Sequence, residues 1–297
     1  MPTVNITMVT CNRLSLTRTC LESLLPTLGS AVSLCIVDNG SQDGSQDYLR
    51  GIAAAHPQVR LVILARNMGV AVAANLGWAL RDADYYLKLD NDMQIMQPGW
   101  LHTLLELAES APEVGLVAHR VCDWHSIEPA RLSSGEVFFL SPCANGACVL
   151  IPRRVHERFG FWTEDYGRYG FEDLDYSNRV RAGGLLVGYA PETDAIRHLG
   201  YEQDVDEKHE SIKRTARTSI VAGQKVYLLN TFLFEQGIRD SYVPRKYLPD
   251  MSANPVTFTM NKAYRPIMQL HRELIDKVAY RVDGDVVELD LSRLKSS

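Results

Sequence analysis

The chain has 297 residues, of which 46% are hydrophobic and 23% are charged, the balance of a soluble globular protein with ample core. Its formal net charge of −5 argues against a nucleic-acid partner, because proteins that bind phosphate backbones usually carry a basic excess or stripe. No apolar segment approaches the ~20 residues needed to span a bilayer, so we expect no transmembrane segment.

The cysteines and the first residues bear on the compartment. Six cysteines are scattered without a Cys-x-x-Cys pair, which predicts small core residues in a reducing compartment and argues against a disulfide framework or a zinc site. Residues 1–3 lead directly into a strand-like run, with no charged n-region, apolar h-region or cleavage site. We therefore expect a cytoplasmic protein.

The first 118 residues alternate between apolar runs and segments with helical spacing. The apolar runs predict strands at residues 4–10, 32–37, 59–65, 85–89 and 114–118. Between them, leucine and alanine recur at helical intervals, which predicts helices at residues 14–28, 46–56, 70–80 and 100–110. Strands and helices that alternate at this spacing indicate βαβ units and a mostly parallel sheet, that is, an α/β fold.

The pattern changes after residue 118. Two strand candidates, residues 136–140 and 144–151, are separated by too few residues for a crossover helix, so we expect an antiparallel insertion in the sheet. A short helix at 153–159 and a longer one at 172–182 precede a last strand at 185–189.

The last third of the chain has a different character. It becomes charged and then helical from about residue 205 to 234. Near the end, Asp283-Gly284 separates strand candidates at 278–282 and 285–291, a strong signal for a two-residue hairpin turn. We therefore place a boundary near residue 204, between an α/β domain at 1–204 and a helical extension with a terminal β-hairpin at 205–297.

Polar side chains follow the predicted strands at the points where the strands end. An open α/β sheet binds ligands beyond the carboxyl ends of its strands, which places residues 10–12, 38–41, 65–67 and 90–92 on one rim.

Asp90 and Asp92 come directly after the strand at 85–89, and side chains two apart on an extended backbone point the same way. Two carboxylates at a strand end suit Mg²⁺, which reaches proteins through one or two carboxylates plus substrate phosphates. Taken alone, Asp-Asn-Asp is more typical of a solvated turn, and only the rest of the chain reverses that preference.

Two phosphate-binding fingerprints are absent from the sequence. There is no Gly-x-Gly-x-x-Gly and no Gly-x-x-x-x-Gly-Lys-[Ser/Thr]. We therefore do not expect an NAD-linked dehydrogenase or a P-loop NTPase. A nucleotide can still bind if a metal on Asp90 and Asp92 neutralises its diphosphate.

Seven short motifs between residues 4 and 200 carry a resemblance to a known family. They are Val-Thr-Cys-Asn-Arg at 9–13, Val-Asp-Asn-Gly-Ser-Gln-Asp-Gly at 37–44, Asn-Met-Gly-Val-Ala at 67–71 with Asn-Leu-Gly at 75–77, Leu-Asp-Asn-Asp at 89–92, Asn-Gly-Ala-Cys at 145–148, Gly-Phe-Glu-Asp-Leu-Asp at 170–175 with Arg179 and Gly183, and Arg-His at 197–198. Each motif is loose, but their order is specific, and the chain resembles the family 2 glycosyltransferases. This resemblance implies the GT-A fold, transfer of a sugar from a nucleotide-sugar, and inversion of the anomeric centre.

The resemblance also implies roles in donor and metal binding. Asp38 would hydrogen-bond the nucleotide base. Asp92 would bind the metal together with Asp90, and His198 matches a further metal ligand found in many family members. An imidazole ligand would shift the preference from Mg²⁺ towards Mn²⁺. The other donor-binding positions that the resemblance implies are Thr10, Asn12, Arg13, Asn67 and Asn91. Asp90 would also contact the ribose or the sugar of the donor.

Asp173 matches the family's catalytic base, which deprotonates the acceptor hydroxyl, and Glu172 stands beside it. Without the resemblance, acidic residues at a helix start are simply favourable charges on the helix dipole. The dipole would lower the pKa of a base, whereas a neighbouring carboxylate and partial burial would raise it. The sequence leaves the direction of the shift open.

An aromatic and glycine-rich segment, residues 159–171, precedes these acids. Its rings Trp162, Tyr166 and Tyr169 are candidates for an acceptor wall, because rings give apolar contact area with specific geometry. Buried aromatic residues dominate protein cores as well, so packing in the core is an equal alternative.

We therefore expect a metal-dependent inverting glycosyltransferase with its nucleotide-sugar-binding and catalytic site in residues 1–204. The donor would be UDP-linked, the cofactor Mn²⁺ or Mg²⁺, and the acceptor a hydroxyl, with a carbohydrate favoured. The alternative is a non-catalytic nucleotide-sugar or carbohydrate-binding protein of the same fold. A Mg²⁺-dependent phosphohydrolase is a further alternative, but it gives no role to Asp38 or Asp173. The sugar, the acceptor and the oligomeric state stay open.

Overall fold

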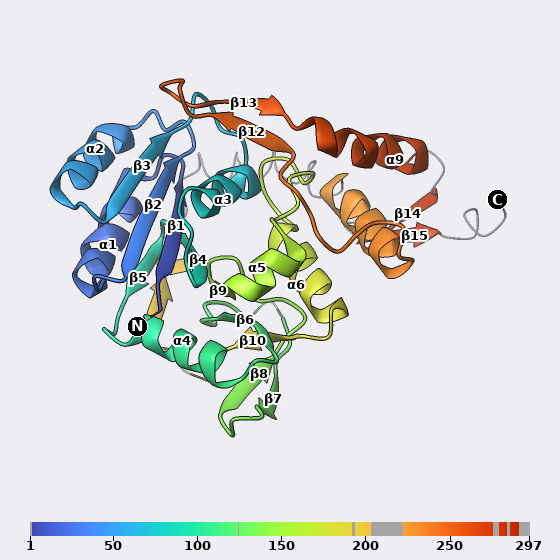
Figure 1. Cartoon of the computed structure of the whole chain (residues 1–297), viewed down its shortest axis with the longest axis horizontal. Helices are drawn as coiled ribbons and strands as arrows, with labels where there is room; N and C mark the ends of the chain where they lie inside the picture. Colours follow the sequence, from blue (N-terminus) through green and yellow to red (C-terminus); the bar gives the residue numbers. More distant parts are fainter. Residues whose placement is uncertain are drawn as a thin grey trace.

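A computed structural model describes residues 2–123, 125–191, 194–202, 222–275, 279–283 and 286–290. In this part of the chain the centre is a nine-stranded sheet with the order β3-β2-β1-β4-β9-β6-β10-β8-β7 (Figure 1). Its strands are β1 Val4–Thr10, β2 Val32–Asp38, β3 Val59–Ile63, β4 Tyr85–Asp90, β6 Val114–Ala118, β7 Glu128–Arg131, β8 Val137–Leu140, β9 Cys148–Pro152 and β10 Leu186–Tyr189.

Helices cover both faces of the sheet (Figure 1). They are α1 Leu14–Leu24, α2 Ser45–Ala55, α3 Val70–Ala79, α4 Trp100–Ser110, α5 Arg153–Phe159 and α6 Glu172–Ala182. Apolar side chains of α1, α2 and α4 share one core cluster with the central strands, and those of α3, α5 and α6 share another. Within β4, Leu87 and Leu89 belong to the first cluster and Tyr86 to the second, as the alternation of side chains along a strand requires. The predicted α/β arrangement is confirmed.

The first half of the sheet is parallel, and its register aligns the strand ends. β1 pairs in parallel with β2 and with β4, and β2 pairs in parallel with β3. Thr10 lies opposite Asp38 in one pair, and Val9 lies opposite Asp90 in the other. The rim that the sequence predicts at these strand ends is therefore present.

The antiparallel insertion is confirmed, but the two strands do not pair with each other. β9 lies antiparallel between β4 and β6, whereas β8 pairs antiparallel with β10. The predicted start of the later strand at residue 144 is wrong, because β9 begins at Cys148. The residues before it form a loop whose backbone is held by side chains: the Ala144 N–H donates to Ser177 Oγ (3.2 Å) and the Ala147 N–H to Asn145 Oδ1 (2.8 Å).

Two short strands were not expected. β5 Met93–Ile95 pairs antiparallel with β11 Ile196–His198, and α7 Leu199–Glu202 follows β11. This small sheet brings a late segment of the chain against the strand end that carries Asp90 and Asp92.

The described C-terminal part consists of a helix over 222–235, the hairpin of β12 Tyr247–Asp250 and β13 Thr257–Met260, helix α9 Arg265–Ile275, and the hairpin of β14 Ala279–Asp283 and β15 Val286–Asp290. The predicted helix at 205–234 lies outside the described residues up to 221. The terminal hairpin is confirmed, although Asp283 belongs to β14 and pairs with Val286. The sequence predicted neither β12 and β13 nor α9.

The residues beyond 222 pack directly on the α/β part. Backbone bridges join Leu64 to Val256 and Gly160 to Val243. The carboxylate of Glu164 accepts the backbone N–H groups of Lys246 (2.9 Å) and Tyr247 (2.9 Å). The boundary near residue 204 stays a prediction.

The cysteines and the helices agree with the expectations from composition. Cys20, Cys35, Cys143 and Cys148 are buried thiols, and none of the six cysteines forms a disulfide. In the described ranges, no helix is both long and apolar enough to cross a membrane.

Candidate active site

Asp38 is a fully buried carboxylate at the end of β2. Its Oδ1 atom accepts hydrogen bonds from the backbone N–H of Ser41 (3.0 Å) and the side-chain amide of Gln46 (3.0 Å). Its Oδ2 atom is also buried and has no hydrogen-bond partner in the described part of the chain. A buried acceptor without a donor is unfavourable, so this atom is suited to accept an N–H group from a ligand.

The loop after β1 has a constrained backbone that orients Arg13. Asn12 and Arg13 both have positive φ, 58° and 64°, a region that non-glycine residues rarely adopt. Asn12 is held to the neighbouring rim loop: its N–H donates to Ser41 Oγ (2.7 Å) and its Oδ1 accepts from the Gln42 N–H (2.8 Å). This clamp places the guanidinium of Arg13 2.9 Å from Asp92.

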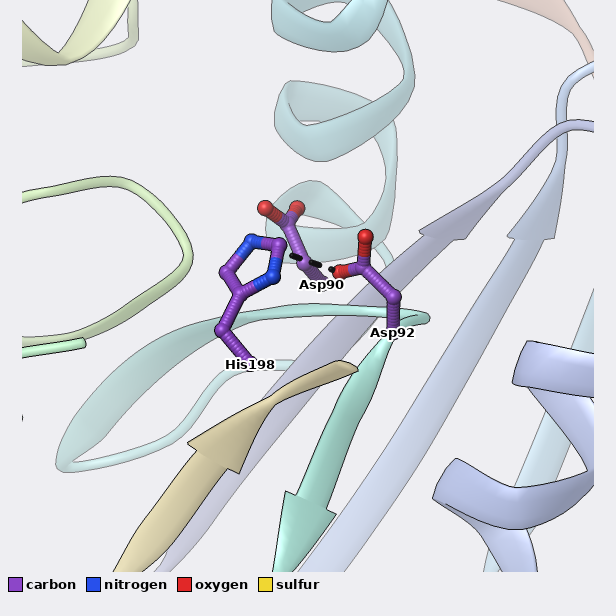
Figure 2. Close-up of side chains that lie close together, drawn as sticks. All are labelled: Asp90, Asp92 and His198. Atoms are coloured by element: carbon purple, nitrogen blue, oxygen red, sulfur yellow. Dashed lines mark ion pairs between the residues drawn. The ribbon is translucent and has the colours of Figure 1, made fainter. Parts of the chain in front are cut away.

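Asp90, Asp92 and His198 form one cluster (Figure 2). Each offers a ligand atom, and these atoms all lie within 4.8 Å of one another. The two carboxylates come from the end of β4 and the residue before β5. His198 comes from β11, whose antiparallel pairing sets it opposite Met93, and the Leu199 N–H donates to the Asp92 carbonyl (2.9 Å).

The cluster fits a divalent cation. Asp92 Oδ1 is buried, has no hydrogen-bond partner among the described residues, and lies 3.7 Å from His198 Nε2. Carboxylate oxygens with an imidazole nitrogen are donors that Mn²⁺ and related ions accept. Two cations of the protein already balance the acids, Arg13 at Asp92 and Lys88 at Asp90.

Glu172 and Asp173 begin α6, directly after Phe171, whose φ is 69°. The backbone N–H of Gly146 donates to Asp173 Oδ2 (3.0 Å), and that of Leu174 donates to Asp173 Oδ1 (2.8 Å). These two bonds fix the carboxylate of Asp173 against the loop before β9. A side chain at residue 146 would not fit, because a Cβ there would lie 2.9 Å from the Trp162 ring and 3.3 Å from Asp173.

Burial decides the direction of the pKa shift at this acid pair. Burial raises the pKa of Asp173 in spite of its two backbone donors. Burial and the adjacent Asp173 carboxylate raise the pKa of Glu172 to about 8, although the charge of Lys88 opposes the shift. The helix dipole, which the sequence offered as an opposing influence, does not prevail. Burial thus raises the pKa values of both acids, and a carboxylate with a raised pKa is a stronger proton acceptor once it is ionised.

Three comparisons with known proteins bear on this site. The family model described as "Glycosyl transferase family 2" matches residues 5–164, more than half of the chain. The chain belongs to glycosyl transferase family 2.

Relatives and solved structures agree with this family. The "Uncharacterized glycosyltransferase YibD" of Escherichia coli (strain K12) is 34% identical over 124 residues, which are 39% of this chain and 36% of that protein. A mannosyltransferase, PcManGT from Pyrobaculum calidifontis, in complex with GDP-Man and Mn²⁺ has a TM-score of 0.57 at 16% identity, covering 92% of this chain and 70% of its own. GalNAc-T7 with UDP, GalNAc and Mn²⁺ has a TM-score of 0.56 at 12% identity. The match covers 67% of this chain and 43% of the GalNAc-T7 chain.

These likenesses show the GT-A fold, as predicted. The matches cover between 18% and 36% of the length of the curated relatives. Glycosyl transferase family 2 is therefore established for the chain, whereas its donor, its acceptor and its activity are matters for a proposal.

Several positions predicted to bind the donor hold the rim together. The side-chain amide of Asn91 donates to the hydroxyls of Thr10 (3.3 Å) and Thr17 (2.8 Å), all buried behind the strand ends. Asn67 accepts the Gly69 N–H (2.9 Å) and donates to Cys11 Sγ (3.3 Å). Their contacts with a nucleotide stay predictions.

The aromatic segment divides between core and surface. Trp162 is 2% exposed and lies edge-on against Trp78 with ring centroids 5.2 Å apart. Tyr166 is 5% exposed and its hydroxyl donates to Asp175 (2.8 Å). For these two rings the alternative of core packing is correct and the predicted acceptor wall is wrong, because the Trp162 ring packs against Trp78 and the Tyr166 hydroxyl is bonded to Asp175. Only Tyr169 is exposed, at 59%.

Tyr169 lies close to both acidic groups of the site. Burial of its hydroxyl end and the negative charges of Asp90, Glu172, Asp173 and Asp92 raise its pKa. Tyr169 is thus an exposed ring whose pKa responds to the carboxylates of both acidic groups. Its role at the acceptor side stays a prediction.

Two positions that contact the acids of the site escaped the sequence reasoning. Lys88 is 1% exposed and forms an ion pair with Asp90, and Gly146 connects Lys88 to Asp173. The apolar run Tyr-Tyr-Leu-Lys-Leu did contain a signal for Lys88, because a lysine in a buried strand is rarely found without a charged partner. No sequence signal revealed Gly146 beyond its place in a loose motif.

Proposed function

We propose that this chain is a metal-dependent inverting glycosyltransferase that moves a sugar from a UDP-linked nucleotide-sugar to an acceptor hydroxyl. The observation that carries the proposal is the presence of two acidic groups joined through Lys88 and Gly146, one suited to a cation and one to a proton. The cation group is Asp90, Asp92 and His198, and the proton-accepting group is Glu172 and Asp173. Mn²⁺ in the structures of both solved neighbours supports a divalent ion here.

The donor nucleotide would be held by the strand-end rim. Asp38 Oδ2 would accept the imide N–H of the uracil ring, which would satisfy its buried, unpartnered oxygen. Arg13 is 29% exposed at its side chain and would reach the donor diphosphate from the constrained loop after β1. The two solved neighbours were bound to GDP-Man and to UDP with GalNAc, so the base preference needs a direct test.

The metal would be held by Asp90, Asp92 and His198, and when bound it would neutralise the diphosphate and stabilise the charge of the leaving group. Asp173 would take the proton of the acceptor hydroxyl as that oxygen attacks the anomeric carbon from the face opposite the diphosphate. The bond from the anomeric carbon to the diphosphate breaks as the new bond forms, so the anomeric configuration inverts. The backbone N–H groups of Gly146 and Leu174 keep Asp173 in place for this step.

A two-stage experiment tests this proposal. Thermal unfolding is measured with UDP, GDP and their sugar conjugates, each with and without Mn²⁺; a ligand at 100 times its Kd adds about 2.7 kcal/mol of stability. The stabilising conjugate is then incubated with an acceptor library, and the anomeric configuration of the product is read by NMR. We expect Mn²⁺-dependent stabilisation by a UDP-sugar and an inverted product. Binding without transfer would support the non-catalytic alternative, and full activity in EDTA would contradict the metal dependence.

A further inference from the structure

Lys88 occupies an unusual place for a lysine. It is in the middle of β4, in the central part of the sheet, and its side chain is 1% exposed. Along an extended strand its side chain shares a face with Asp90, two residues on. Lysine is almost never fully buried unless it is paired. The ammonium is therefore held in the protein and is closed off from a donor or acceptor in solution.

The ammonium of Lys88 has two partners, and both belong to the active site. Its Nζ atom forms an ion pair with Asp90 Oδ1 and donates to the carbonyl of Gly146 (3.3 Å). The N–H of the same residue, Gly146, donates to Asp173 Oδ2 (3.0 Å). A continuous chain of contacts thus runs from Asp90 through Lys88 and Gly146 to Asp173.

The backbone beside these contacts is equally constrained. The Asp90 N–H donates to the Ala147 carbonyl (2.8 Å), so Asp90 is held to the loop before β9 independently of Lys88. Gly146 has no room for a side chain between Trp162 and Asp173. Removing the lysine would consequently remove a charge from beside Asp90 while the strand pairing that places Asp90 remains.

The positive charges beside Asp90 and Asp92 differ in their exposure to solvent. Arg13, at Asp92, is 29% exposed at its side chain and is open to solvent. Lys88, at Asp90, is enclosed. One acid therefore has an exchangeable counter-charge, and the other has a permanent one.

We propose that Lys88 is a positioning residue that supplies a permanent counter-charge to Asp90 and, through the Gly146 peptide, holds the side-chain carboxylate of Asp90 relative to Asp173. This deepens the proposed function and rests on it where the metal is concerned. The counter-charge weakens metal binding in the absence of a nucleotide, because a fixed cation repels an arriving one. The metal site would then be filled mainly together with a diphosphate, which adds negative charge of its own.

The direction in which Mn²⁺ affinity changes when Lys88 loses its charge distinguishes a counter-charge from simple structural support. Lys88→Met keeps the length of the side chain and removes its charge, and we expect it to bind Mn²⁺ alone several-fold to about tenfold more tightly than the wild type, as expected for loss of one nearby like charge. Lys88→Arg keeps the charge and should stay near the wild type. Lys246→Met is the matched control, because it removes another paired, largely buried lysine that contacts Asp165 and not the site. Titration calorimetry with Mn²⁺, without nucleotide, gives the three affinities. Unchanged or weaker Mn²⁺ binding by Lys88→Met would overturn the proposed counter-charge.

A second measurement does not depend on a metal. Asp90→Asn leaves the buried ammonium of Lys88 without its carboxylate, so it should lower the melting temperature in EDTA. Adding Lys88→Met to Asp90→Asn should restore part of this loss, and adding Lys246→Met should restore none. If the melting temperature of the double variant falls by the sum of the decreases in Asp90→Asn and Lys88→Met, Lys88 does not act through Asp90 and the proposal is wrong. If the wild type binds no Mn²⁺ even with UDP, the metal dependence of the proposed function fails, while this cycle still decides the role of Lys88.

Discussion

Two aspartates with buried side chains, Asp92 and Asp165, have neighbours of similar type but differ in how many hydrogen-bond partners their oxygens have. In the first cluster, Asp92 lies beside Arg13 and His198, with Asp90 and Lys88 next to it. In the second cluster, Asp165 lies beside a lysine, an arginine, a histidine and a tyrosine. Its partners are Lys246 (2.9 Å), Tyr264 (2.6 Å), His271 (3.8 Å) and Arg239 (3.9 Å).

The two aspartates differ in the partners of their carboxylate oxygens. Both oxygens of Asp165 face donors or cations, and although its burial alone would raise the pKa, Lys246, Arg239 and His271 lower it. Asp92 keeps one buried oxygen without a hydrogen-bond partner in the described ranges. A satisfied carboxylate joins the C-terminal part of the chain to the rest, whereas an unsatisfied one is suited to a ligand. The same residue types therefore serve stability in one place and binding in the other.

The largest expected effect separates the two clusters directly. Asp92→Asn should weaken Mn²⁺-dependent UDP binding by more than about 100-fold, because even groups behind the direct ligands contribute 10- to 100-fold to metal affinity. Asp165→Asn should leave that binding unchanged. Calorimetry on the two purified variants makes the comparison. Equal UDP affinities in Asp92→Asn and the wild type, with Mn²⁺ present, would remove Asp92 from the metal site.

The next effect concerns the acid pair. Asp173→Asn keeps the size of the side chain and removes the proton acceptor, so kcat should fall by about 10²–10⁴-fold while the donor Kd stays within a few-fold. Glu172→Gln is the control and should lower kcat less. Single-turnover and steady-state kinetics are required once an acceptor is known. Retention of more than about a tenth of the rate by Asp173→Asn would exclude it as the base.

Stability should respond in the reverse order. Asp165→Asn leaves Lys246 and Arg239 without their carboxylate in a buried position, which should lower the free energy of unfolding by about 3–5 kcal/mol. Asp92→Asn should lower it much less, because its partner Arg13 is partly exposed and can turn to water. Urea unfolding of both variants, in EDTA, measures the difference. Equal losses would show that the two clusters do not differ as described.

Base recognition should have a smaller effect. Asp38→Ala removes the buried acceptor that we assign to the uracil N–H, and it should weaken UDP binding by about 1.5–3 kcal/mol, the range for hydrogen bonds to charged groups. The binding of Mn²⁺ alone should not change. An unaltered Kd for UDP would leave Asp38 as a residue that only shapes the loop through Ser41 and Gln46.

The last effect is a dependence of stability on pH. The pKa of Glu172 is raised to about 8 in the folded protein, whereas an unfolded glutamate titrates near 4.3. Between these values the folded state holds one more proton than the unfolded state, so stability falls as pH rises, by at most about 1.4 kcal/mol per pH unit from this group. Glu172→Gln removes this contribution. The wild type should therefore lose stability relative to Glu172→Gln between pH 5 and pH 8 in thermal unfolding, and parallel curves would contradict the raised pKa.

Local patterns were sufficient for the parallel half of the molecule. Apolar runs and helical spacing predicted the helices α1 to α4 and the strands β1 to β4, although not β5, because each buries its side chains within a βαβ unit of neighbouring sequence. The position of Asp38 and Asp90 at one rim followed from the strand-end rule and was confirmed by the register. The strand at 144 was misplaced because Ala-Asn-Gly-Ala reads as part of an apolar run, although Asn145 and Ser177 hold its backbone as a loop.

The sequence by itself determined the family, the α/β fold and the acids at the strand ends, since these depend on periodicity and on motifs that are contiguous in the chain. Only the tertiary structure decided which rings are buried, in which direction the pKa of Glu172 moves, and that Lys88 pairs with Asp90 and reaches Asp173 through Gly146. Those properties depend on desolvation and on contacts between segments distant in sequence, such as β4, the loop before β9 and α6. Local patterns carry no information about such distances.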